Sequence, residues 1–293
     1  MEVTKSNRAF VTFGIGQSFI DNCEILANYL LKYTTADVLI YYGKGTPSPS
    51  ASPRLHKINL EELDLNFDIK KFPNPLNPFI IKETLSLYDE VAYLDSDIQV
   101  TPNVKDIFQE VFKITTYPLA CRYPWYYTMV NGNNWVGDKI IQSIPYENQT
   151  TPTLGVSCTV SNKSCIPFLS KWIDLSLELC EPDRAEASEK EGIHEEAIFN
   201  ALVWQTNGNN FITTKLAWAP TPEAILEALE IYASPEEKPY HPDATNPSFI
   251  LEKNTWGGGM SCIPLNKNEL WGLHTIKTPH LVKEAYLYIE KHF

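Results

Sequence analysis

The first hundred residues alternate between short apolar runs and amphipathic stretches. Residues 9–13 and 38–42 predict strands, and apolar positions spaced three and four apart over residues 17–33 predict a helix between them. A second unit follows, with a helix predicted over 78–87 and a strand over 90–94. Strands that alternate with helices are typical of an α/β fold, in which helices flank a mainly parallel central sheet.

The pattern becomes less regular after this point. Residues 46–53 are rich in Ser and Pro, which indicates a loop. The polar and aromatic stretch 123–153 is too long for a simple connection, so we expect it to shape a binding surface. We expect an acidic linker over 181–192 and find no internal repeat. The other predicted elements are helices over 104–112, 166–179, 194–204 and 281–292 and strands over 119–122 and 155–160.

Composition narrows the classes of partner. With 293 residues, 43% of them hydrophobic, the chain can bury one large core or two coupled lobes. The net charge of -12, with no basic cluster, argues against a nucleic acid partner. The first apolar run resembles neither a signal peptide nor a membrane span, so we expect a cytoplasmic protein without an integral membrane segment. The six cysteines have no metal-site or disulfide-framework spacing, and we expect reduced thiols.

Two carboxylates follow the strand predicted over 90–94. Asp95 and Asp97 are two residues apart, and since side chains along a strand alternate with a period of two, both can face the same side. Converging carboxylates suit Mg²⁺ or Mn²⁺, which fill their remaining positions with phosphate oxygens and water. An Asp-x-Asp alone is also typical of a turn after a strand, with side chains that cap the backbone.

The surroundings of these acids resemble one enzyme family. An apolar strand, then Asp95-Ser96-Asp97, then a short helix is similar to the metal-binding strand of glycosyltransferase family eight, the glycogenin-like enzymes. The resemblance implies one GT-A domain over 1–293, with a nucleotide-sugar half over about 1–115 and an acceptor and catalytic half over about 116–293. It also implies that a carboxyl-terminal part closes the donor site. The implied cofactor is Mn²⁺ or Mg²⁺, and the implied donor is a nucleotide-sugar, with UDP-hexose as our first expectation.

A segment near the carboxyl end extends this resemblance. Gly272 to Pro279 is similar to the family's His-x-x-Gly-x-x-Lys-Pro segment, although it lacks the glycine and has a shorter gap from histidine to lysine. The resemblance implies that His274 is the third metal ligand and that Lys277 contacts the β-phosphate. Taken alone, His274 is equally typical of a partly buried core histidine.

A third segment supplies the catalytic candidates. His194-Glu195-Glu196-Ala197-Ile198-Phe199-Asn200 resembles the Asp-Gln-x-x-x-Asn helix start of family eight and the His-Asp-Glu-Ser-His-Leu-Asn stretch of family six, the blood-group transferases. Both families retain anomeric configuration. The resemblance implies that Glu196, with Glu195 beside it, acts opposite the leaving group, where a carboxylate can stabilise an oxocarbenium-like transition state. Alternatively, both glutamates only favour the amino end of a helix, or Glu196 deprotonates the acceptor and inverts the product.

Further positions are candidates for contacts with the donor. Gly14 and Asp95 follow predicted strands and Gly155 opens one, and loops of this kind can meet around one cleft. Gly155 lies in a segment similar to the family's Asn-Ser-Gly-Val, without the asparagine and serine. Lys82 is where the family has a basic residue, or it only occupies an exposed helix face. The candidates for sugar contacts in the long segment are Tyr123, Trp125, Tyr126, Tyr127, Asn133, Asn134, Trp135 and Asp138.

Two alternatives to a hexosyltransferase stay open. A haloacid-dehalogenase-type phosphatase also uses Asp-x-Asp, although Thr or Val is typical at the position of Gln99. A non-catalytic carbohydrate-binding protein is compatible with the same fold and aromatic residues. The turn at Gly14-Ile15-Gly16 lacks the basic residues of a nucleotidyltransferase and the third glycine of a dinucleotide fingerprint. We therefore expect a metal-dependent enzyme that transfers hexose to a glycan or another hydroxyl acceptor.

Overall fold

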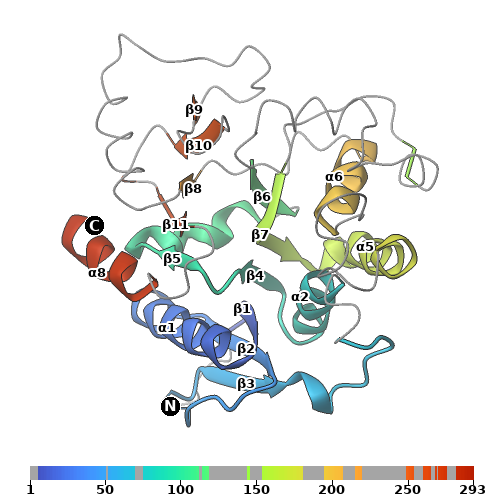
Figure 1. Cartoon of the computed structure of the whole chain (residues 1–293), viewed down its shortest axis with the longest axis horizontal. Coiled ribbons are helices and arrows are strands. Elements are labelled where there is room, and N and C mark those ends of the chain that lie inside the picture. Colours follow the sequence, from blue (N-terminus) through green and yellow to red (C-terminus); the bar gives the residue numbers. More distant parts are fainter. Residues whose placement is uncertain are drawn as a thin grey trace.

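A central six-stranded sheet with helices on both faces organises the chain (Figure 1). This computed structural model describes residues 6–50, 52–69, 75–111, 114–118, 144–145, 154–180, 195–206, 215–219, 249–253, 260–264, 268, 270–275 and 282–293. The α/β architecture expected from the alternating pattern is confirmed. None of the helices within these ranges is long and apolar enough to cross a membrane.

The strand order of the central sheet is β3-β2-β1-β4-β7-β6. Strands β1 to β4 run parallel to one another, whereas β7 is antiparallel to both β4 and β6. The sheet is therefore mainly parallel, with one strand of opposite direction near its edge. The strands are β1 (Arg8–Ile15), β2 (Asp37–Gly43), β3 (Leu55–Asn59), β4 (Glu90–Leu94), β6 (Thr115–Pro118) and β7 (Leu154–Asn162).

The residues that precede α1 and η2 favour the start of a helix. Gly16 precedes α1 with a φ of 94°, a conformation that glycine adopts at little cost. Thr101 precedes the 3₁₀ helix η2, and its side chain accepts a hydrogen bond from the backbone N–H of Asn103. The helices are α1 (Gln17–Tyr33), α2 (Leu76–Leu87), α5 (Ile166–Leu179), α6 (Glu195–Gln205) and α8 (Val282–His292), with 3₁₀ turns η1 (Leu60–Glu62), η2 (Pro102–Glu110) and η3 (Lys163–Cys165).

Two hydrophobic cores lie on the two faces of the central sheet. Alternate residues of the strands point to opposite faces, so Phe10 joins one core and Val11 joins the other. Helices α1 and α8 and the 3₁₀ helix η2 cover the first face, and α2, α5 and α6 cover the second (Figure 1). Both cores contain large side chains that are completely buried, which fixes the helices relative to the strands.

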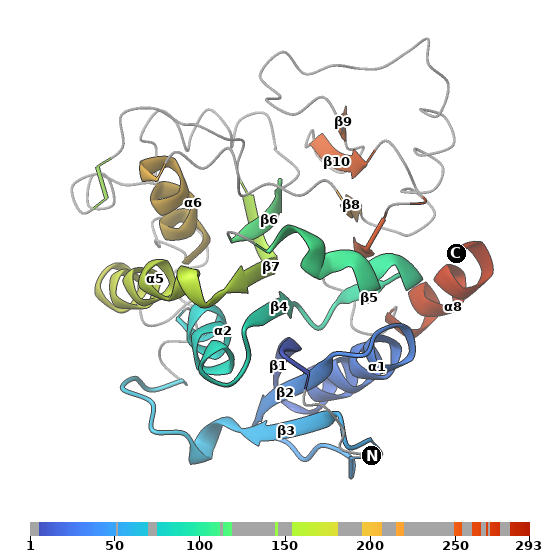
Figure 2. The same ribbon diagram turned by 180° about the vertical axis from the view of Figure 1, so that it is seen from behind.

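Two smaller sheets complete the described structure. In the first, β5 (Ile98–Val100) pairs antiparallel with β11 (Gly272–Thr275), which pairs parallel with β8 (Leu216–Ala219). The second joins β9 (Phe249–Lys253) to β10 (Met260–Pro264). Figure 2 shows the view from behind, where the chain passes from β4 directly into β5. This connection links the central sheet to the three-stranded sheet.

The expected elements agree with the structure in most of the amino-terminal half and differ in two respects. The helix expected over 104–112 is the 3₁₀ helix η2, which begins at Pro102. The short strands β3, β5, β6, β8, β9, β10 and β11 were not expected. The strand expected over 119–122 and the acidic linker over 181–192 lie outside the described residues, and so does nearly all of 123–153.

Candidate metal centre

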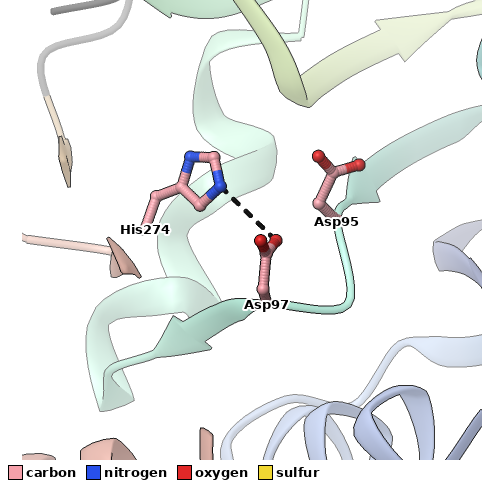
Figure 3. A group of neighbouring side chains, drawn as sticks. All are labelled: Asp95, Asp97 and His274. Carbon is pink, nitrogen blue, oxygen red and sulfur yellow. Dashed lines mark ion pairs between the residues drawn. The ribbon is translucent and has the colours of Figure 1, made fainter. Parts of the chain in front are cut away.

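Asp95 and Asp97 lie on the turn that connects β4 to β5. Strand β4 ends at Leu94, as expected, so a turn and not the alternation of a strand sets the directions of the two acids. The backbone N–H of Asp95 donates to the carbonyl of Ser157 at 2.7 Å, and the N–H of Ile98 donates to the carbonyl of Asp95 at 3.1 Å. This second bond closes the turn, and the turn brings the two carboxylates together (Figure 3).

His274 reaches these acids through the pairing of two short strands. It lies on β11 opposite Ile98, the first residue of β5. Its Nε2 is 3.4 Å from Oδ1 of Asp97, and one ligand atom from each of Asp95, Asp97 and His274 lies within 4.8 Å of the others (Figure 3). Two carboxylates and one imidazole form a donor set that fits Mn²⁺ or Mg²⁺ with positions left for phosphate oxygens and water. The three expected metal ligands are thus brought together.

Burial and neighbouring charges have opposing effects on the pKa values of Asp95 and His274. Burial and the negative charge of Asp97 raise the pKa of Asp95, while His274 and hydrogen bonds from Tyr93 and Ser157 oppose this rise. Burial disfavours a charged His274, but the hydrogen bond to Asp97 and the charges of both aspartates outweigh it and raise the pKa of His274. A positive charge is therefore stabilised between the two carboxylates, which is the electrostatic requirement of a cation site.

Tyr93 and Ser157 orient Asp95, and neither was identified from the sequence. The hydroxyl of Tyr93 donates to Oδ1 of Asp95. Tyr93 is completely buried on β4, two residues before Asp95. Hydrogen bonds of this kind fix the direction of a carboxylate ligand. The period of the strand would have placed Tyr93 on the same side as Asp95, whereas Ser157 belongs to β7 and is near only in the folded chain.

Glu195 and Glu196 begin helix α6. The negative charge of Glu196 contributes to the raised pKa of His274, which places this carboxylate within electrostatic reach of the triad. Glu195 is buried, and its backbone carbonyl accepts a hydrogen bond from Nε1 of Trp172 at 2.9 Å. This hydrogen bond ties the start of α6 to α5. The catalytic roles expected for both glutamates stay predictions.

The start of α6 is also tied to the central sheet by Asn200. Its Oδ1 accepts from the N–H of Leu154 at 2.8 Å, and its Nδ2 donates to the carbonyls of Leu154 at 3.0 Å and Glu196 at 2.8 Å. Asn200 is completely buried. One amide thereby fixes the first turn of α6 against the first residue of β7.

The remaining donor-binding candidates occupy separate positions. Gly14 is buried near the end of β1, and a Cβ atom there would lie 2.7 Å from the backbone N of Ile20. The close packing of α1 against β1 is therefore a sufficient reason for glycine at this position. Gly155 is buried on β7, opposite Tyr117 beside an irregularity in the register. Lys82 is partly buried on α2. Their expected donor contacts stay predictions.

Several expected site residues lie outside the described residues. These are His194, Lys277, Tyr123, Trp125, Tyr126, Tyr127, Asn133, Asn134, Trp135 and Asp138. No protein-family model and no curated protein matches this chain. Function is therefore inferred from the chemistry of the triad and its place in the fold, since a fold alone does not fix an activity.

Proposed function

We propose that this protein is a metal-dependent glycosyltransferase that moves a hexose from a nucleotide-sugar to a hydroxyl acceptor. The observation that carries the proposal is the convergence of Asp95, Asp97 and His274 beside the end of β4. In open α/β sheets, ligands bind beyond the carboxyl ends of the strands. A mainly parallel sheet with such a triad is compatible with a GT-A fold.

The triad would hold the cation, and the cation would neutralise negative charge on the departing diphosphate. Asp97 and His274 would be direct ligands. Asp95 would be a third ligand or would bind the ribose of the donor, with its carboxylate oriented by Tyr93. Lys277 would contact the diphosphate. The negative charge on the diphosphate increases as the bond to the sugar breaks, and these groups then stabilise the diphosphate more strongly. This lowers the barrier to its departure.

Glu196 would act near the anomeric carbon. In the reaction, the bond from this carbon to the diphosphate oxygen breaks and a bond to the acceptor oxygen forms. A carboxylate on the face opposite the diphosphate stabilises positive charge on the sugar. A diphosphate oxygen would take the proton from the acceptor, and the product would retain configuration. Proton NMR of the first-formed anomer tests retention, and an inverted anomer would instead assign Glu196 as the base.

The decisive experiment measures donor hydrolysis and transfer across a panel of UDP-sugars and GDP-sugars with and without Mn²⁺. We expect one donor to turn over only with metal, and Asp97→Ala to abolish that turnover without unfolding the chain. Asp89→Ala is the matched control, because Asp89 is an exposed acid that precedes β4 at its other end.

Normal turnover by Asp97→Ala would exclude this metal centre. If no donor of the panel turns over and metal has no effect on nucleotide binding, the proposal is contradicted. In that case, trapping of an aspartyl-phosphate would favour the phosphatase, and glycan affinity without turnover would favour a carbohydrate-binding protein.

A further inference from the structure

The geometry of the triad depends on one pair of short strands. Strand β5 begins directly after Asp97, and β11 carries His274. Because His274 is registered opposite Ile98, the position of β5 sets how closely Asp97 approaches the imidazole. A slip of one residue in this pairing would turn His274 to the other face of the small sheet.

Strand β5 is an edge strand of its sheet and is paired with β11 on one side only. Tyr286 of α8 lies at its other edge. The N–H of Val100 donates to the hydroxyl oxygen of Tyr286 at 3.2 Å, and this hydroxyl donates to the carbonyl of Ile98 at 3.2 Å. Ile98 and Val100 are buried, so these backbone groups need partners within the protein. One hydroxyl thus accepts and donates along the edge, as a neighbouring strand would.

The position of this hydroxyl is itself well determined. Tyr286 is completely buried, and its ring stacks on Tyr29 of α1 with 3.7 Å between centroids and 3° between planes. Helices α1 and α8 lie side by side in both views (Figures 1 and 2). Burial raises the pKa of Tyr286, so the hydroxyl keeps the proton that it donates to Ile98.

We propose that Tyr286 is a positioning residue for the metal centre, because it holds the outer edge of β5 and so keeps Asp97 in reach of His274. The inference rests on the metal site of the proposed function. It adds that α8, which supplies no metal ligand among the described residues, contributes to metal affinity through the backbone of β5.

The test compares two tyrosine-to-phenylalanine variants of the full chain. Tyr286→Phe removes the hydroxyl and leaves the ring to stack on Tyr29. We expect Mn²⁺ affinity, measured by electron paramagnetic resonance of the free ion, to fall by about tenfold, as for other groups that support metal ligands. We also expect the visible spectrum of bound Co²⁺ to change, because that spectrum reports coordination geometry.

Tyr41→Phe is the matched control. Tyr41 is buried on β2, and its hydroxyl is 3.2 Å from Oγ1 of Thr84, so this variant loses one buried hydrogen bond, where Tyr286→Phe loses two of the same length. We expect Tyr41→Phe to lose measurable stability, although less than Tyr286→Phe, and to keep the Mn²⁺ affinity and the Co²⁺ spectrum of the wild type.

Each outcome separates the positioning role from the proposed function. If wild type binds Mn²⁺ and Tyr286→Phe matches it in affinity and in Co²⁺ spectrum, the role of Tyr286 is overturned and the metal site stands. Equal losses of Mn²⁺ affinity in Tyr286→Phe and Tyr41→Phe also overturn the role, because a general loss of stability would then explain both. If folded wild type itself binds no Mn²⁺, the proposed metal site fails, and the inference fails with it.

Discussion

At Gly14 the first turn of α1 lies directly against the end of β1. A Cβ atom at this position would be 2.7 Å from both the backbone N of Ile20 and the backbone C of Phe19. Neither atom can move without shifting the helix. We therefore expect Gly14→Ala to lower the free energy of unfolding by about 1–3 kcal/mol, measured by urea denaturation.

The control for Gly14→Ala lies at the end of the neighbouring parallel strand. Gly43 is also buried, but a Cβ atom there would meet only Cδ1 of Leu60, at 3.9 Å, which is ordinary contact. Gly43→Ala should therefore leave stability nearly unchanged. Equal stability of the two variants would show that α1 tolerates a side chain at Gly14, and would leave ligand approach as the reason for glycine.

The residue scale also shows how far the site could be predicted from the sequence. Asp95 and Asp97 alone are also typical of a turn, and the apolar strand before them with the short helix after them favoured a metal site through its resemblance to a family. His274 is 177 residues away from Asp97, and only the resemblance to a family motif indicated it. Ser157 has no local signal at all, since its contact with Asp95 depends on the antiparallel pairing of β4 with β7.

At the scale of elements, Asn200 joins α6 to β7. Its amide satisfies both backbone groups of Leu154 and the carbonyl of Glu196. Asn200→Asp keeps an acceptor for the N–H of Leu154, but an ionised carboxylate cannot donate to either carbonyl. We expect a loss of about 3 kcal/mol in the free energy of unfolding at pH 7.5, because the variant buries a charge and leaves acceptors unsatisfied.

The pH dependence of Asn200→Asp distinguishes this cause from poor packing. Burial should raise the pKa of the introduced carboxyl above its unfolded value. The deficit relative to wild type should then be largest above this folded pKa and should shrink as pH falls through it, because the protonated acid regains a donor. Asn59→Asp is the control. Asn59 accepts from the N–H of Glu61 at a helix start, where aspartate serves equally well, and its donated bond to Glu62 is exposed to water, so the variant should lose little stability. A deficit independent of pH would contradict the explanation.

The elements with strong local periodicity were predicted best. The helices over 17–33 and 166–179 and the strand over 90–94 match the structure residue for residue. Strands β5 and β11 have three and four residues, too few for a period to emerge. They form because their backbones pair across the fold, with Tyr286 at the outer edge, and this is tertiary structure that no short window contains.

For the whole molecule, alternation of strands and helices predicted a mainly parallel sheet but not its complete strand order. Strands β1, β2 and β3 lie side by side in chain order, whereas β4 crosses over to pair with the other edge of β1. Strand β7 enters between β4 and β6 in the opposite direction, after a long segment without periodicity. The sequence therefore indicated the fold class, while the antiparallel edge beside the candidate site required the structure.

The triad connects parts of the molecule that are distant along the chain, so metal binding should stabilise the whole fold. An ion held by Asp95, Asp97 and His274 bridges the end of β4 to the three-stranded sheet, and the unfolded chain cannot form this site. A ligand that binds only the folded state stabilises it by about 2.7 kcal/mol when its free concentration is about 100 times its dissociation constant. We expect Mn²⁺ to raise the midpoint of thermal unfolding, followed by circular dichroism, in proportion to the logarithm of its concentration at saturation. Asp97→Ala should lose this rise and Asp89→Ala should keep it, whereas an equal rise in both variants would locate the stabilising ion elsewhere.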